Sequence, residues 1–336
     1  MTAATQATPS GDATGRLRRA LANAPAAPVY VVLLVLFVTS GVLVTVFTGG
    51  AYFTPDVVTS ILVRAVALGL VAAGQTVVIL AGSLDLSVAY TVSVTAVMAS
   101  FIMDGQADRM GFATVVVLII GAAIGLANGL IITKLRVNPF IATLGVGLML
   151  RGVLFASVDN FTGSVPPEYQ ALGYNFIGPV PLSVVLLGLV FLVGWFVLRY
   201  TRFGHHVFAV GGSEEVSRLS GVRSDRVLIG AHVICSLTAV LAGIFLVSRL
   251  RSGAPWVGTD GAYDLESIAA VVLGGTALSG GKGTIMGTLA GVLILAVLDN
   301  VFNALQITAF AKDVLRGVIL IAAVAFYVVR DRRIAR

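Results

Sequence analysis

A carboxylate interrupts one of the most apolar parts of the chain, in the run Ala81-Gly82-Ser83-Leu84-Asp85-Leu86-Ser87. At membrane depth such a charge costs about 2.5–3.5 kcal/mol on insertion scales, so Asp85 should face protein, water or the interface and not lipid. Gly82 permits a backbone bend, and Ser83 or Ser87 can cap the next helix. Two interpretations stay open: a tight cytoplasmic turn capped by Asp85, or a broken helix that lines a pathway.

Other polar side chains beside apolar segments offer hydrogen bonds or stacking to a ligand. Asn138 precedes a proline and is expected to be the N-cap of a helix, and its neighbour Phe140 can stack on a substrate ring. Asn300 and Asn303 follow Asp299 late in an apolar segment, as a polar helix end or as hydroxyl-binding groups. The candidates for a substrate pathway are therefore Gly82, Ser83, Asp85, Ser87, Asn138, Phe140, Asn300 and Asn303.

Charged residues elsewhere have two expected roles. Arg151 and Arg316 each lie within an apolar segment, where they either snorkel to the headgroups or act together in gating or lining a pathway. Asp260, Asp264 and Glu266 cluster in an expected outer loop, as solvated charges or as contacts to an external partner.

Several kinds of chemistry are excluded by the residues present. The run Gly275–Thr284 (GTALSGGKGT) superficially resembles a phosphate-binding loop, but Gly283 stands where a Ser or Thr should follow Lys282. Close helix packing suits its glycines better. Cys235 is the only cysteine and the three histidines are scattered, so we expect no metal site. We also expect no catalytic residues and no cofactor bound by this chain.

The composition is that of an integral membrane protein. Of the 336 residues, 57% are hydrophobic and only 11% are charged. The apolar runs are continuous rather than alternating, so they are helices and not barrel strands. We expect an all-α polytopic protein with a disordered tail over residues 1–27 and a transmembrane domain over residues 28–336. About ten spans are expected, at 28–55, 57–81, 86–103, 110–133, 138–158, 169–198, 227–248, 267–281, 283–298 and 317–329.

The distribution of Lys and Arg sets the expected orientation. Short cytoplasmic loops hold an excess of positive charge, which places both termini and the polar segment 199–226 in the cytoplasm. The net charge of +6 is scattered over these loops, so nucleic acid is not expected as a partner. The expected partner is the lipid bilayer.

Three weak matches suggest an internal repeat. Residues 78–83 (VILAGS) are echoed by 271–276 (VVLGGT), the pair Gly121/Gly125 by Gly287/Gly291, and residues 150–153 (LRGV) by 315–318. The last match pairs spans that cross in opposite directions, so we expect inverted repeats around a pathway, with chance similarity as the alternative. Gly274, Gly275 and Thr276 join the pathway candidates.

The polar segment carries Glu215-Val216-Ser217-Arg218-Leu219-Ser220-Gly221, with the spacing of the E-A-A-x-x-x-G docking signature of ABC importer permeases. Residues 204–221 (GHHVFAVGGSEEVSRLSG) resemble the cytoplasmic segment of ribose-type sugar permeases. The AGSLDLS run resembles their GG-x-D-L-S motif, and residues 138–151 and 263–281 extend the likeness. The chain therefore resembles the membrane subunit of ribose/xylose/arabinose/galactose-type ABC importers.

This resemblance implies an ABC importer permease fold and a monosaccharide, pentose or hexose, as the substrate. It implies an ATP-binding subunit that holds ATP and Mg²⁺, an extracytoplasmic sugar-binding protein, and a second permease subunit, identical or paralogous, in a bacterial cell membrane. A short helix near 213–219, ended by Gly221, is expected to dock on the ATPase. The coupling residues expected there are Gly211, Gly212, Glu214, Glu215, Arg218 and Gly221.

Other classes remain as alternatives. An ABC permease for branched-chain amino acids or nucleosides belongs to the same distant superfamily, and an ion-coupled secondary transporter would need a better buried ion site than Asp85 provides. A membrane enzyme lacks any nucleophile–base constellation in the sequence, and buried glycine-rich repeats argue against a simple scaffold. The sequence does not name the sugar.

Overall fold

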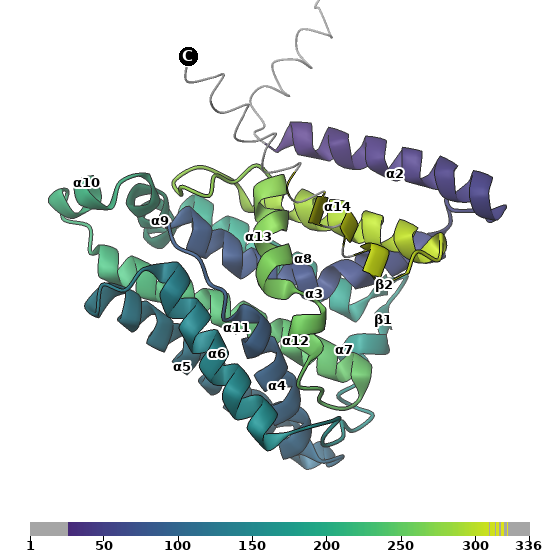
Figure 1. Ribbon diagram of the computed structural model, residues 1–336, viewed down its shortest axis with the longest axis horizontal. Helices are drawn as coiled ribbons and strands as arrows, with labels where there is room; N and C mark the ends of the chain where they lie inside the picture. Colours follow the sequence, from purple (N-terminus) through teal and green to yellow (C-terminus); the bar gives the residue numbers. More distant parts are fainter. Residues whose placement is uncertain (1–25, 309, 313, 316, 319–320, 322–336) are drawn as a thin grey trace, which may run out of the picture.

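A computed structural model describes residues 26–308, 310–312, 314–315, 317–318 and 321, which are folded mostly into helices (Figure 1). The elements in chain order are α2 (Ala27–Thr48), α3 (Pro55–Leu80), α4 (Val88–Met103), η1 (Ala107–Arg109), α5 (Met110–Lys134), α6 (Pro139–Ser157), α7 (Ala171–Tyr174), β1 (Phe176–Ile177), β2 (Val180–Pro181), α8 (Leu182–Tyr200), α9 (Arg202–Gly212), α10 (Glu214–Leu219), α11 (Ser224–Leu250), α12 (Val257–Asp260), α13 (Tyr263–Leu273) and α14 (Ile285–Ala304). The strands β1 and β2 pair antiparallel as a small hairpin.

Within the described residues, seven helical segments are long and apolar enough to cross a membrane: α2, α3, η1 with α5, α6, α8, α11 and α14. The helix α4 has 16 residues and α13 has 11, so both fall short of the roughly 20 that a bilayer requires. Most of the last expected span, 317–329, lies outside the described residues. The membrane-helix architecture is as predicted, while the count of about ten stays a prediction.

Two expected spans have different bounds from those the apolar runs suggest. The run 169–198 first forms the short helix α7 and then the hairpin, and its long helix begins only at Leu182, because a glycine turn at Gly178 and the proline Pro181 hold residues 176–181 in the hairpin. The run 267–281 ends as a helix at Leu273, since Gly275 adopts a left-handed conformation with φ +85°.

The helix α11 forms the centre of the molecule and packs against α3, α4 and α5. Glycines allow the close approach. A Cβ added to Gly125 of α5 would lie 2.6 Å from the His232 carbonyl oxygen, and one on Gly74 of α3 would lie 2.6 Å from Cys235 Cα. Cys235 is fully buried, as expected for a core residue.

The helices α3 and α13 end in the same way. Gly82 N–H donates to the Ile79 carbonyl and the next N–H to that of Val78, and Gly275 N–H donates to the Val272 carbonyl and the next N–H to that of Val271. Both glycines have positive φ, +79° and +85°. This agreement supports the local match of residues 78–83 with 271–276. It does not by itself establish a repeat of the whole halves.

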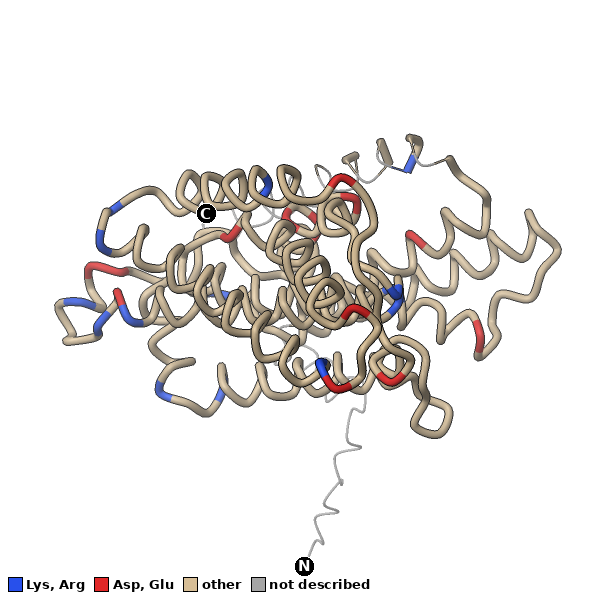
Figure 2. The backbone as a smooth tube through the Cα atoms, turned by 90° about the horizontal axis from the view of Figure 1, so that it is seen from below, with Lys and Arg blue, Asp and Glu red and all other residues tan. Residues whose placement is uncertain are grey.

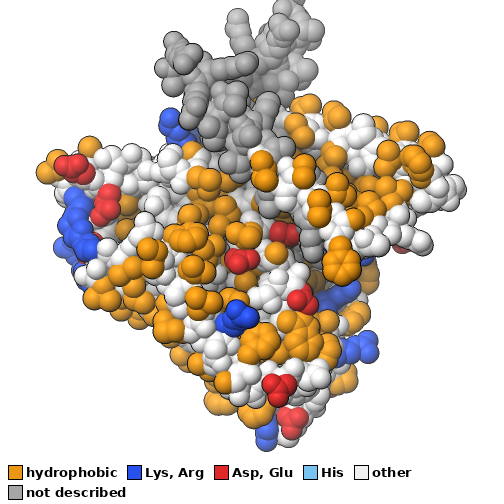
Figure 3. Space-filling view, viewed as in Figure 1, with side chains coloured by type: hydrophobic (Ala, Val, Ile, Leu, Met, Phe, Trp, Pro, Cys, Tyr) orange, Lys and Arg blue, Asp and Glu red, His pale blue; other side chains and the backbone are white. Residues whose placement is uncertain are grey.

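The molecule has two ends of different character. The helices α9 and α10 lie at one end, on the left in Figure 1, and the β1–β2 hairpin lies toward the other. Many of the basic residues gather at the α10 end, as Figure 2 shows in blue. Hydrophobic side chains cover much of the surface between the ends, and Figure 3 shows charged side chains at the α10 end and in the middle of the face in view.

Candidate functional site

A cavity of about 680 Å³ lies toward the β1 end, away from α10. Its walls are the first half of α3, the last turns of α11, the segment from α12 into α13, and the end of α14. We call it the Arg64 cavity. Its volume falls within the roughly 300–1,000 Å³ that small-molecule sites occupy.

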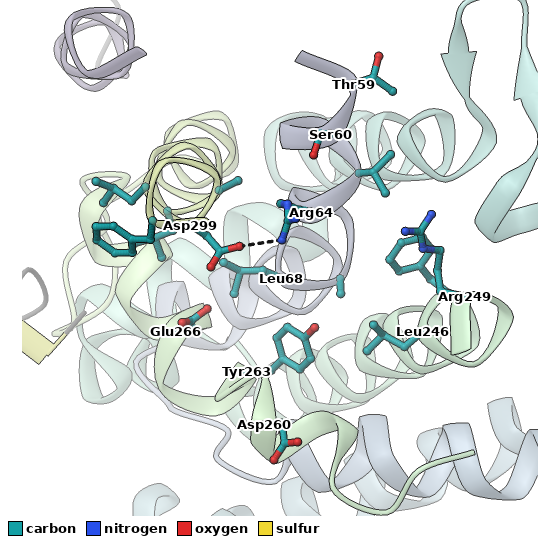
Figure 4. Close-up of a pocket in the computed structure, with 18 of the residues that line it drawn as sticks. Thr59, Ser60, Arg64, Leu68, Leu246, Arg249, Asp260, Tyr263, Glu266 and Asp299 are labelled. Carbon is teal, nitrogen blue, oxygen red and sulfur yellow. Dashed lines mark hydrogen bonds and ion pairs between the residues drawn. The ribbon is translucent and has the colours of Figure 1, made fainter. Parts of the chain in front are cut away.

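An ion pair crosses one wall of the Arg64 cavity. Arg64 Nη1 of α3 lies 3.2 Å from Asp299 Oδ2 of α14, and the side chains are 44% and 24% exposed. Asn303 donates a hydrogen bond to the same carboxylate oxygen at 3.1 Å, and Lys312 in turn donates to Asn303 Oδ1. In Figure 4 the Arg64 and Asp299 side chains point toward one another from their two helices.

Further polar and aromatic groups face the same space. Tyr263 and Glu266 reach it from α13 and Asp260 from the end of α12, while Arg249 stands opposite on α11 (Figure 4). Arg249 is held in place because it donates to the Gly173 carbonyl at 3.1 Å and its guanidinium lies 5.1 Å from the centre of the Tyr174 ring. The cavity therefore combines charges of both signs with an aromatic ring.

Asp85 lies in a second, fully buried polar cluster within the break between α3 and α4. Ser87 donates to Asp85 Oδ1 through its N–H at 2.9 Å and its hydroxyl at 2.6 Å. His232 of α11 places Nδ1 at 3.1 Å from Asp85 Oδ2 and Nε2 at 2.9 Å from Ser83 Oγ. Asn128 of α5 donates to the Ser87 hydroxyl at 2.8 Å. The carboxylate faces protein, as its cost in lipid requires.

A smaller cavity of about 380 Å³, which we call the Asn138 cavity, lies at the α10 end. Gly82, Ser83 and Asn138 line it, together with Gly211 and residues at the start of α10. Asn138 is the N-cap of α6, as predicted, because its side chain accepts from the Phe140 N–H at 2.9 Å.

The predicted pathway residues are thus divided between places. Gly82, Ser83 and Asn138 line the Asn138 cavity, whereas Asp85 and Ser87 are buried beside it. The side chain of Phe140 is 50% exposed on α6. Asn300 and Asn303 lie near the far end of α14, next to Asp299 of the Arg64 cavity, and Gly274, Gly275 and Thr276 form the break after α13.

The structure places only one of the two predicted arginines. Arg151 is exposed on α6, and Arg316 lies outside the described residues. Their role as a pair remains a prediction.

The polar segment forms the short helix predicted there. Ser213 caps α10 by accepting the Val216 N–H at 3.3 Å, and Gly221 follows its end with φ +82°. The predicted Glu214 and Arg218 form an i,i+4 pair at 3.7 Å, and Glu215 is exposed. Val216 and Leu219 are 61% and 83% exposed, although they lie at the basic, polar end of the molecule. Exposed apolar groups of this kind are typical of a protein contact.

Sequence reasoning missed His232 and most of the Arg64 cavity. Asp260 and Glu266, expected to be solvated or to meet an external partner, line this cavity. One signal was present: Arg64 interrupts an apolar helix, and an intramembrane charge of this kind needs a partner such as Asp299.

The protein is polytopic and of the transport-permease class. It combines helices that can span a membrane, a charged cavity toward one end, and the short helix α10 with exposed apolar side chains at the other end. The chain belongs to the family described as branched-chain amino acid transport system / permease component, which matches residues 57–324.

Three named relatives show the substrates of similar proteins. The chain is 39% identical to the ribose import permease protein RbsC of Escherichia coli, over 81% of this chain and 86% of that protein. It is 36% identical to the L-arabinose transport system permease protein AraH of Escherichia coli, over 85% and 88%. It is 34% identical to the fructose import permease protein FrcC of Rhizobium meliloti, over 92% and 87%. No solved structure matches the chain. These relatives confirm the predicted resemblance to sugar importer permeases.

Proposed function

We propose that this chain is the membrane-spanning permease subunit of an ATP-driven ABC importer that moves a monosaccharide into the cell. The observation that carries the proposal is the similarity, over most of the chain, to three permeases named for ribose, L-arabinose and fructose. The Arg64 cavity supports it, because sugar hydroxyls suit the charged hydrogen-bonding groups there and a sugar ring suits Tyr263.

The α10 end is proposed to be cytoplasmic. Its basic residues follow the positive-inside rule, and both termini would then be cytoplasmic in a bacterial cell membrane. The Arg64 cavity would open toward the outside, where an extracytoplasmic sugar-binding protein delivers the substrate. A second permease subunit, identical or paralogous, would complete the membrane part.

The helix α10 is the proposed docking element for a separate ATP-binding subunit, which would hold ATP and Mg²⁺. Val216 and Leu219 supply exposed apolar contacts, and Glu215 and Arg218 supply charges around them. Movements driven by ATP hydrolysis would then reach this chain through α9 and α10, and the ATP itself would be hydrolysed on the partner subunit.

A second candidate substrate class is suggested by the family description, which names branched-chain amino acids. Arg64 and Asp299 together could receive the carboxylate and ammonium groups of an amino acid. The names of the relatives favour a sugar.

Uptake into proteoliposomes tests the proposal. The permease is reconstituted with its ATPase and binding-protein partners, and uptake of labelled ribose, arabinose, fructose and leucine is measured with ATP or a non-hydrolysable analogue at the ATPase side. We expect uptake of one sugar that requires hydrolysable ATP and survives ionophores. Uptake that persists without the ATPase and collapses with the ion gradient would establish a secondary transporter instead, and uptake of leucine alone would establish the amino-acid alternative.

A further inference from the structure

Three stretches of backbone meet at the α10 end with no side chain between them. They are the end of α9 at Gly211, the end of α3 at Leu80–Gly82, and the loop between α13 and α14 at Gly280–Gly281. Gly281 N–H donates to the Leu80 carbonyl at 3.0 Å, so the two helix breaks are bonded directly to each other. We call this contact, made by Gly82, Gly211, Gly280 and Gly281, the glycine junction.

Only glycine fits at position 211. A Cβ added there would lie 1.8 Å from the Leu80 carbonyl oxygen and 2.7 Å from the Gly281 nitrogen. Both of these atoms belong to the backbone, so no side-chain rotation can make room. A Cβ on Gly280 would likewise lie 2.8 Å from the Gly211 carbonyl oxygen and 2.8 Å from Gly82 Cα. The neighbouring Gly212 differs, since a Cβ there meets no heavy atom within 4 Å.

Three helices that leave the glycine junction, α3, α13 and α14, also line the Arg64 cavity. The helix α3 carries Arg64 toward one end and finishes at Leu80 in the junction. The helix α13 begins with Tyr263 in the cavity and ends just before the junction loop, and α14 begins just after that loop and carries Asp299 near its far end. A shift at the glycine junction therefore acts on one end of α3, α13 and α14, and the other end of each of these helices forms part of the cavity wall.

We propose that Gly211 is a positioning residue for energy coupling, which transmits movement of α9 and α10 to α3, α13 and α14 through backbone contact. Side-chain contacts can absorb a small shift by changing rotamer, whereas this contact has no rotamers to change. Packed interfaces pass on sub-ångström shifts for this reason. The proposal rests on the proposed function, because it assumes that an ATPase moves α10.

Gly211→Ala and Gly212→Ala form a matched pair for the test. Each adds one methyl group to α9, and only the first meets the backbone of both helix breaks. The two variants are reconstituted with the ATPase and the binding protein, and three quantities are measured: ATPase co-purified, ATP hydrolysed, and uptake of the sugar that the wild-type complex transports. Any effect shared by both variants belongs to α9 itself. We expect Gly211→Ala to assemble and hydrolyse ATP, with uptake per ATP about tenfold or more below that of Gly212→Ala.

A second pair approaches the junction from the loop. Gly280 and Gly275 both have φ +85°, so alanine is forced into a left-handed conformation at either position. Only Gly280→Ala also meets the junction, since a Cβ on Gly275 has no heavy atom within 4 Å. We expect the lower uptake per ATP in Gly280→Ala, and this pair decides the question if Gly211→Ala does not assemble.

Equal uptake per ATP within both pairs would overturn the proposal. So would a loss of assembly by both Gly211→Ala and Gly280→Ala but by neither reference variant, because the junction would then only hold the fold together. A failure of the proposed function looks different, since the wild-type complex itself would then show no ATP-dependent uptake.

Discussion

Arg64 and Asp299 face each other at 3.2 Å although 235 residues separate them, and they join α3 to α14 at the wall of the Arg64 cavity. Each charge lies on a helix that is apolar enough to cross a membrane. Without its partner, each would have to be solvated by water or by a ligand in the cavity. The pair is therefore placed where a polar substrate would compete with it for hydrogen bonds.

Asp299→Asn and Arg64→Gln should each lower uptake about 10-fold or more, as expected when charge-assisted hydrogen bonds of about 1.5–3 kcal/mol are lost. The stability change should stay below about 1 kcal/mol, because both side chains are partly exposed. Uptake kinetics and thermal melting of the purified complex measure the two effects. Arg109→Gln, which removes a positive charge from η1, is the control. Wild-type uptake in both cavity variants would show that the pair does not serve transport.

Tyr263 presents an aromatic ring with a hydroxyl group to the Arg64 cavity (Figure 4), whose other aromatic lining residues, Phe176, Phe245 and Phe302, are phenylalanines. Tyr263→Ala should raise the KM for uptake about 2- to 12-fold, as expected for loss of an aromatic contact worth about 0.5–1.5 kcal/mol. Tyr263→Phe keeps the ring and should stay within about twofold of wild type if stacking dominates. A KM raised equally in both variants would assign the effect to the hydroxyl group instead.

The buried pair of Asp85 and His232 should govern stability. Removing one partner leaves the other polar and buried, at a cost of about 3–5 kcal/mol. Asp85→Ala and His232→Ala should therefore each lower the melting temperature strongly, and the double variant should be less destabilised than the sum of the two. Melting of the detergent-solubilised permease measures this. Additive effects would mean that the two side chains do not interact.

Docking of α10 should depend on its exposed apolar side chains. Leu219→Asp should lower the amount of co-purified ATPase about tenfold or more, because a charge would replace a group expected to be desolvated in the complex. Leu135→Asp is the matched control, since Leu135 is 70% exposed and follows α5, whose last residue, Lys134, pairs with Asp225 at the start of α11. Co-purification reduced equally by both variants would exclude a specific role for α10.

Local signals were sufficient for some elements. The length of apolar runs predicts most spans because bilayer thickness sets it, and Ser213 and Gly221 predict α10 because caps act within one turn. The apolar character of residues 267–281 predicts a span that runs eight residues past the observed end of α13, because the left-handed glycine Gly275 ends the helix early.

Contacts between distant residues were not readable in the same way. Asp85 and His232 are 147 positions apart, and nothing near either residue specifies the pairing. The Arg64 cavity draws its lining from five helices and from β1, so its composition depends on how they pack. Gly211 and Gly212 are identical neighbours in the sequence. Their difference lies in the backbone that faces them.

The short helix α13 lies between the two cavities. Eleven residues extend about 16 Å, roughly half of the hydrocarbon core. Tyr263 at its start belongs to the Arg64 cavity, and Ser279 in the loop that follows belongs to the Asn138 cavity. The helix α13 and the loop after it therefore connect a cavity at one end of the molecule with a cavity at the other. A shift of α13 along its axis would change the walls of both cavities at once.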